Sequence, residues 1–237
     1  MSSYSLDLDK IGPVEVTKKR GMRTIRLRID RSGRPVVSAP WYVTRSVIAD
    51  FVKSKEDWLQ KHARQDTLQF YNGMPVGKGL TLRIVEDAHK MRSRLTHDSI
   101  IIFVVGSHDS ANTEQHDYIE RTVIRALRQQ AENLVLPRLL AKSAELDIPF
   151  GQATVKRVHG RWGSCDRDKN IVMSMYLVQL PMHIVDYVII HELAHTKHMN
   201  HGPAFWAEVA KHCPSHKLIR LQLKRYDPKI YDQSKML

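Results

Sequence analysis

One apolar segment that carries three chemically active side chains constrains this chain more than any other feature. Residues 188–195 read VIIHELAH, so that His191 and His195 lie four residues apart and Glu192 directly follows the first histidine. Residues four apart on a helix share one face, with Cβ atoms about 5–6 Å apart. Two imidazoles on such a face can reach one zinc ion at about 2.0–2.1 Å. The HExxH spacing therefore predicts a metal site on a buried helix, with Glu192 as the general base.

Three later histidines compete for the place of the third ligand, because a catalytic zinc site usually has three protein ligands and one open position. His198 lies seven residues from His191, which is roughly 10.5 Å along a straight helix and too far for a shared ion. His212 would need its own helix to fold over the site. His201 directly precedes Gly202, where a sharp turn could bring it back. The spacing therefore favours His201.

Composition sets broad limits on the kind of protein. Hydrophobic residues make up 42% of the 237 positions, enough to build a core. The formal net charge of +12 is typical of proteins with anionic partners, and a soluble surface that is simply rich in Lys and Arg explains it equally well. The two cysteines, Cys165 and Cys213, are too few for a disulfide framework. No apolar run approaches the roughly 20 residues that cross a bilayer, and no signal peptide is recognisable. We expect a cytoplasmic protein that does not associate with membranes.

Hydrophobic periodicity predicts an α+β fold in two parts: a β-rich region with one helix over residues 1–108, and a metal-binding catalytic domain over residues 109–237. One helix should run from a cap at Thr44 to about Arg64, and a long one should begin near Thr113 and be kinked or split by Pro137. The metal-binding helix should span residues 183–198 and be followed by a short amphipathic helix. Strands are predicted at residues 22–29, 35–39, 80–86, 99–105, 153–159 and 170–177.

Several motifs together resemble the YgjP-like metallopeptidase family, which is related to the SprT-like and WLM zinc proteases. They are RWGSC at residues 161–165, NIVMSMYLVQLP at 170–181, HELAH at 191–195 and HGPAFW at 201–206. The likeness extends to an Arg-rich strand pair and to Asp57-Trp58-Leu59, so it covers most of the chain. It implies a zincin-like core with Zn²⁺ held by His191, His195 and His201, Glu192 as the base, and a peptide or protein substrate. The metzincin motif has the same His191–His201 spacing but has glycine where this chain has His198, so the chain is not assigned there.

The resemblance leaves supporting roles open. In related zincins a strand before the active-site helix pairs with the substrate, which would place the peptide on residues 170–177; core packing explains this strand equally well. An oxyanion stabiliser could be Arg161, Tyr176, Tyr187 or Tyr226, and Asp186 or Glu208 could orient the histidines. Cys165 could act as a nucleophile with His159, could be a reversible zinc ligand, or could be a buried free thiol.

Two other functions are compatible with the sequence. A metal-dependent hydrolase could attack nucleotide phosphoanhydrides, although the chain has no P-loop. By analogy with SprT-like proteins, a basic N-terminal region could also bind nucleic acid and place a protease on DNA, although a solvated sheet face explains these charges as well. The basic residues of that region are Lys18, Lys19, Arg20, Arg23, Arg26, Arg28, Arg31 and Arg34.

Overall fold

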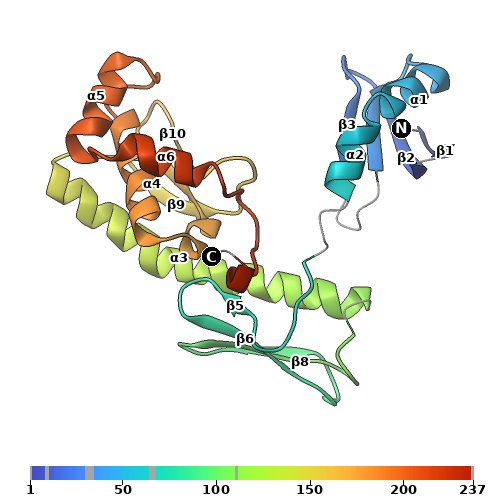
Figure 1. Ribbon diagram of the computed structural model, residues 1–237, viewed down its shortest axis with the longest axis horizontal. Helices are drawn as coiled ribbons and strands as arrows, with labels where there is room; N and C mark the ends of the chain where they lie inside the picture. Colours follow the sequence, from blue (N-terminus) through green and yellow to red (C-terminus); the bar gives the residue numbers. More distant parts are fainter. Residues whose placement is uncertain (1, 9–10, 30–34, 64–67, 110–111, 236–237) are drawn as a thin grey trace. The chain divides into compact units, whose positions relative to one another are not determined.

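The chain folds into two compact units, residues 1–69 and 70–237 (Figure 1). The computed structural model describes residues 2–8, 11–29, 35–63, 68–109 and 112–235. Helices and sheets mix in an α+β fold, as predicted. The predicted boundary after residue 108 falls inside the second unit, and the assignment of a catalytic domain to residues 109–237 stays a prediction.

The first unit is a four-stranded sheet packed against two helices. Its strand order is β1-β2-β4-β3, in which β2 and β4 are parallel. Alternate residues of β2, among them Val14 and Val16, face the same buried cluster as Ile48 and Val52 of α1. The elements are β1 (Ser2–Leu8), β2 (Gly12–Lys19), β3 (Arg26–Ile29), β4 (Pro35–Pro40), α1 (Arg45–Lys53) and α2 (Glu56–Ala63).

The predicted helix after Thr44 starts where expected, but it is two helices rather than one. Thr44 caps α1, and its hydroxyl oxygen accepts a hydrogen bond from the N–H of Val47 at 3.4 Å. The helix ends at Lys53, and α2 begins only at Glu56. The strands β1 and β2 were not predicted, and the predicted turn at residues 30–33 lies outside the described residues.

The long helix α3 (Thr113–Leu146) is the spine of the second unit, and Pro137 does not split it. Asn112 caps its first turn by accepting from two backbone N–H groups at 3.1 Å. Proline removes one donor from the carbonyl of Asn133. Pro137 and Asn133 are both exposed, so that carbonyl faces solvent while the opposite face of α3 is buried continuously. No helix in the described part of the chain is long and apolar enough to cross a bilayer.

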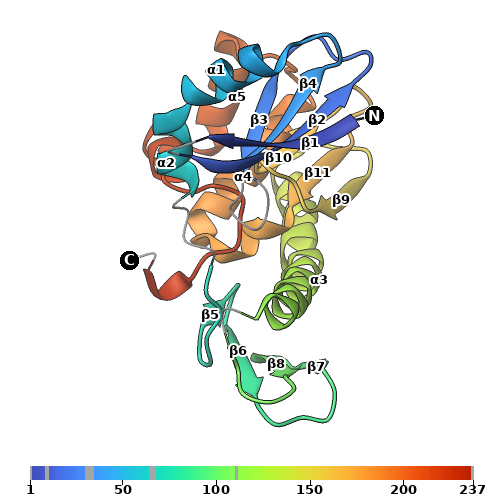
Figure 2. The same cartoon turned by 90° about the vertical axis from the view of Figure 1, so that its right-hand side faces the viewer.

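Two sheets of the second unit contact α3. One, of order β5-β6-β8-β7, meets α3 through β8; the other, of order β10-β11-β9, meets it through β9 (Figures 1 and 2). The short helix η1 (Met175–Gln179) and α4 (Met182–His195) also pack on α3. The strands are β5 (Pro75–Val76), β6 (Leu80–Val85), β7 (Arg92–Leu95), β8 (Ser99–Phe103), β9 (Ala153–Lys156), β10 (Gly163–Cys165) and β11 (Ile171–Ser174).

Of the two alternatives for residues 170–177, pairing with a peptide and packing within the core, the sheet favours the second. Met173 of β11 pairs with Gly163 of β10 on one side and with Val155 of β9 on the other, so β11 is a central strand. The segment after Ser174 is the helix η1 rather than strand. Among the described strands, β10 and β9 are the two edge strands of this sheet, and β11 lies between them.

The buried face of α3 can be tested with two adjacent leucines. Leu139 is fully buried, whereas Leu140 is 60% exposed. We expect Leu139→Ala to lower the free energy of unfolding by about 2–5 kcal/mol because it leaves a cavity. Leu140→Ala should change it by less than about 0.5 kcal/mol. Urea denaturation followed by circular dichroism measures both, and equal costs for the two variants would contradict this packing.

Candidate metal centre

The helix α4 places two histidines side by side in a buried setting. Its apolar residues are buried almost all round, so the helix lies inside the unit rather than on its surface. His191 and His195 share one face, and their ring centroids lie 4.9 Å apart. The helix ends at His195, one turn earlier than predicted, and the hydroxyl of Thr196 donates to the carbonyl of Leu193 at 2.8 Å.

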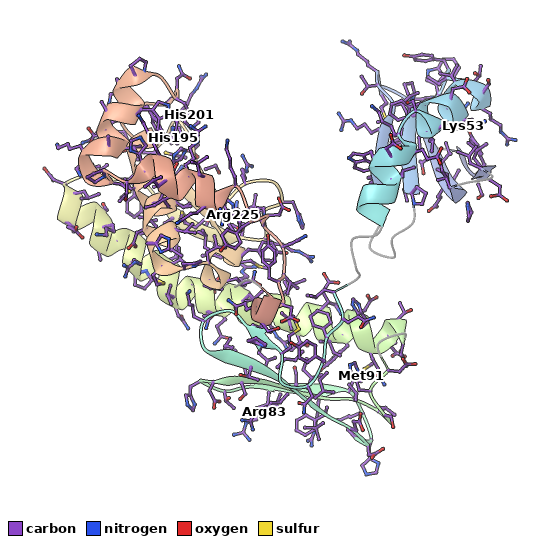
Figure 3. All side chains as sticks on the ribbon, in the orientation of Figure 1. Lys53, Arg83, Met91, His195, His201 and Arg225 are labelled. Atoms are coloured by element: carbon purple, nitrogen blue, oxygen red, sulfur yellow. The ribbon has the colours of Figure 1, made fainter. Side chains whose placement is uncertain are left out.

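The early end of α4 lets the chain bring His201 back to the same place. Gly202 and Pro203 start the next helix, α5 (Pro203–His212), with proline in its first turn, where a missing N–H costs nothing. The ring of His201 lies 5.1 Å from that of His191 and 4.7 Å from that of His195. One ligand atom from each ring lies within 4.8 Å of those of the other two, and Figure 3 labels His195 and His201 at this place.

Hydrogen bonds and burial keep these imidazoles ready to bind a cation. The Nδ1–H of His195 donates to the carbonyl of His198 at 3.1 Å, which fixes the ring and leaves Nε2 free to act as a ligand. The Nε2 atoms of His191 and His201 lie 3.1 Å apart. Burial lowers the pKa of His191 to about 3, and the charges of His195, His201 and Arg220 add to this effect. His191 is therefore neutral at physiological pH, as a metal ligand must be.

Glu192 lies on the side of α4 that faces the strand β10. Its side chain is only 4% exposed, and its Oε2 atom has no hydrogen-bond partner among the described residues. Burial raises the pKa of Glu192 to about 8, and the charge of Arg161 opposes this shift. A Cβ atom on Gly163 would lie 2.7 Å from the Cγ of Glu192, so only glycine leaves room for this carboxyl. No local pattern in the sequence indicates that contact, because the two residues are far apart in the chain.

Comparison with known proteins assigns the chain to a family. A model of the YgjP-like, metallopeptidase domain matches residues 23–226. The chain belongs to the YgjP-like family. Among solved structures, a similar one is the metallopeptidase zymogen of Pyrococcus abyssi abylysin, with 24% identity, a TM-score of 0.35, and coverage of 38% of this chain and 94% of that one. No curated protein sequence matches significantly.

Other polar residues proposed for this YgjP-like site are engaged elsewhere. His212 donates to Glu208 at 3.2 Å, and Lys197 binds the same carboxylate at 2.7 Å, so neither Glu208 nor His212 is directed at the three histidines. Asp186 is held by the guanidinium of Arg138 on α3. Asp186 therefore pairs with Arg138, and Glu208 pairs with Lys197 and His212, so the possibility that either carboxylate orients one of the three proposed ligands does not fit these contacts. His198 is not in the group of three converging histidines, and its carbonyl accepts from His195.

Of the four candidates for an oxyanion stabiliser, some lie near the three histidines or act on Glu192, and others contact residues elsewhere. Tyr176 is buried, and its hydroxyl accepts from the Nε of Arg157 at 3.1 Å, which ties this side chain to Arg157. The ring of Tyr187 lies 5.9 Å from that of His191. The charge of Arg161 reaches Glu192, whereas Tyr226 packs against Tyr231. Tyr187 thus lies beside His191, and the charge of Arg161 acts on Glu192; a role for either stays a prediction.

The nucleophile hypothesis for Cys165 does not fit its surroundings. Burial and the charge of Glu192 raise the pKa of the Cys165 thiol to about 11, so it stays protonated at neutral pH. A thiol nucleophile reacts as the thiolate and needs the opposite shift. The proposed partner, His159, packs against the ring of Tyr176 at 6.4 Å.

A second group of possible ligands lies on the first turns of α3, formed by His116, Asp117 and Glu120. Glu120 already pairs with the Nη2 of Arg157 at 2.9 Å. The guanidinium of Arg157 already binds this carboxylate, and its positive charge repels a further cation. The three histidines around His191 therefore form the better cation site.

The close contact between Gly163 and Glu192 makes a direct prediction. Gly163→Ala should lower the free energy of unfolding by about 1–3 kcal/mol because the added methyl overpacks the site. In a Glu192→Ala background the same change should cost less than about 0.5 kcal/mol, because the clash is gone. Ser164→Ala, one residue along β10, is the matched control and should cost about 0.5 kcal/mol or less. Equal costs of Gly163→Ala in both backgrounds, measured by urea denaturation, would exclude the contact.

Proposed function

We propose that the chain is a zinc-dependent peptidase of the HExxH type, in which His191, His195 and His201 bind the ion and Glu192 is the general base. The observation that carries this proposal is the convergence of three imidazoles from α4 and the loop after it. Membership of a metallopeptidase family supports the reaction class.

The donor set fits zinc. Tetrahedral zinc with Zn–N bonds of about 2.0–2.1 Å separates two ligand nitrogens by about 3.3 Å. The distance of 3.1 Å between the Nε2 atoms of His191 and His201 is close to that value. Three imidazole ligands leave one tetrahedral position open, as catalytic sites do, and imidazole is a preferred zinc ligand.

In this proposal the protein residues divide the proton transfers and the electrostatics between them. When bound, zinc would supply a Lewis acid and lower the pKa of water. The positive charge of a bound zinc ion would oppose the effect of burial on the pKa of Glu192 and would favour its carboxylate form. As the carboxylate, Glu192 would accept a proton from the attacking water at its Oε2 atom and later donate it to the leaving amine. The buried setting of Glu192 and its close contact with Gly163 hold the carboxyl in one place, which favours the transfer.

The strand β10 is the best-placed element to hold a peptide. The backbone N–H of Ser174 donates to the carbonyl of Trp162 at 2.9 Å, and the backbone N–H of Asp166 donates to the carbonyl of Asn170 at 3.0 Å. Because hydrogen bonding alternates along an antiparallel strand, Gly163 and Cys165 turn their backbone groups away from β11. An extended substrate could add to this edge through backbone hydrogen bonds, next to Glu192.

Replacing the general base should separate catalysis from metal binding. Glu192→Gln should lower the rate of peptide cleavage by about 10²–10⁴-fold because the amide cannot accept the proton. Its zinc content should equal that of the unchanged protein. Quenched-fluorescence peptides and metal analysis measure the two quantities. If instead the unchanged protein releases phosphate from a nucleoside triphosphate and the variant does not, the nucleotide hydrolase is the correct alternative.

Removing the metal should have two linked effects. A chelator should abolish cleavage and lower the melting temperature, since an ion bound only to the folded state stabilises it; at 100 times Kd the gain is about 2.7 kcal/mol. Zinc addition should restore both. His195→Ala should already show the low melting temperature and no longer respond to the chelator. An unchanged response in His195→Ala would place the ion elsewhere.

A second candidate, nucleic-acid binding by the first unit, rests on one observation. The strands β2 and β4 end side by side, with Lys19 opposite Pro40, so that Arg20 and Trp41 follow at the same end of the sheet. Trp41 and Tyr42 are 62% and 61% exposed. Exposed aromatic rings beside basic side chains suit single-stranded nucleic acid. Arg31 and Arg34 lie outside the described residues.

This second candidate predicts a salt-dependent affinity for a single-stranded oligonucleotide. Each phosphate that the protein no longer neutralises should reduce the slope of log K against log salt by about 0.7. The double variant Lys19→Glu/Arg20→Glu should therefore bind weakly with a shallower slope. Arg83→Glu, an exposed position on β6, is the control and should keep the slope. Fluorescence anisotropy at several salt concentrations measures it, and equal slopes would reject this surface.

A further inference from the structure

His201 differs from the other two proposed ligands in how it is held. His191 and His195 are fixed by a buried helix, whereas His201 is exposed and lies in the loop between α4 and α5. An exposed side chain on a loop loses rotamer freedom when it binds an ion, and that loss weakens binding. A neighbouring group that fixes the ring beforehand would remove much of this cost.

The indole of Trp206 is the neighbour best placed to fix this ring. It lies on the first turn of α5, and its centroid is 5.7 Å from that of His201 with the two planes inclined by only 27°. The same indole also touches the ring of His191, at 6.0 Å and 58°. The two rings of Trp206 and His201 are nearly parallel, as in stacked aromatic pairs, so that rotation of the imidazole about its side chain would break the contact.

The helix α6 (His216–Leu223) holds the indole in turn. The ring of His216 lies 5.9 Å from that of Trp206 and is inclined by 19°. His216 is itself buried, and its Nδ1–H donates to the carbonyl of Cys213 at 3.1 Å, which fixes its ring. One turn along, the guanidinium carbon of Arg220 lies 4.7 Å from the indole centroid. Trp206 is thus ordered by contacts that do not involve any proposed ligand.

The role of Trp206 is distinct from core packing, which falls to its neighbour Phe205. Phe205 is fully buried and packs directly on the ring of His195 at 4.5 Å. Trp206 is only half-buried, so less of the stability of the fold depends on it. A large effect of Trp206 on metal binding with a small effect on folding would separate the two roles.

We propose that Trp206 is a positioning residue that fixes His201 for the metal and couples the metal site to α6. This inference rests on the proposed function, because it takes His201 as the third zinc ligand. Residues that orient ligands from outside the coordination shell typically change metal affinity by about 10–100-fold. Trp206 would act on the ring of His201 through stacking rather than through a hydrogen bond.

The test compares the zinc Kd of single-tryptophan variants by competition with a chelator of known affinity. Trp206→Leu should raise the Kd about 10–100-fold, and Trp206→Phe, which keeps a ring, should restore most of the affinity. Trp41→Leu, an exposed tryptophan of the first unit, is the matched control and should leave the Kd unchanged. In the Co²⁺-loaded protein, Trp206→Leu should also alter the visible absorption bands, which report ligand geometry.

A second variant keeps the test decisive if Trp206→Leu does not fold. His216→Leu removes the support of the indole and should raise the zinc Kd, by less than Trp206→Leu would. The inference is overturned if Trp206→Leu, or His216→Leu in its place, binds zinc as the unchanged protein does. It is also overturned if Trp206→Leu lowers the free energy of unfolding of the metal-free protein by as much as it lowers the free energy of zinc binding.

The same measurements distinguish this inference from the proposed function. If the unchanged protein binds zinc and His195→Ala does not, the metal site stands whatever Trp206→Leu does. If the unchanged protein binds no zinc, the proposed function fails and the role of Trp206 fails with it.

Discussion

The point at which α4 ends is the constraint on which the candidate site depends. One helical turn can bring only two imidazoles to a shared ion, so a third must come from outside the helix. The helix ends at His195, where Thr196 turns its hydroxyl back to a carbonyl of the last turn. The chain then runs from Thr196 to Gly202 before Pro203 starts α5, and within this loop His201 returns to the first two histidines. A helix continued to His198 would have removed this possibility.

The surroundings of α4 hold it in place and leave one side for chemistry. Its apolar residues pack against α3, and the pair of Arg138 and Asp186 ties the two helices together. Glu192 faces β10 instead, and His191 and His195 face Phe205 of α5. Farther away, the side chain of Gln179 donates to the carbonyl of Lys229 at 2.7 Å and accepts from the N–H of Tyr231 at 2.9 Å, which ties the end of the chain to η1. The histidines thus sit on a rigid framework, as preorganised sites require.

The features that could be predicted from the sequence depend on residues that are close together in the chain. The cap at Thr44 and the face shared by His191 and His195 depend on residues within a few positions of each other, and the return of His201 depends on the turn at Gly202. The features that did not follow depend on distant partners. The binding of Asp186 to Arg138 joins residues 48 positions apart, and no local pattern contains it.

Strand order and exposure explain the other differences. β10 has three residues, too few to show an alternation, and its position at the sheet edge depends on pairing with β11. Tyr176 was a candidate oxyanion stabiliser, and the structure places its hydroxyl in a buried contact with Arg157 that the sequence did not indicate. Pro137 breaks a local rule, but the exposure of that face of α3 lets the helix continue. In each case the tertiary setting decided what the local preference left open.

The most direct measurement of the central claim is anomalous diffraction at the zinc edge from crystals of the protein grown with zinc. The account predicts one strong peak at about 2.0–2.1 Å from a ring nitrogen of each of His191, His195 and His201. A peak only at the second group, His116 with Glu120, or no peak within bonding distance of His201, would contradict it.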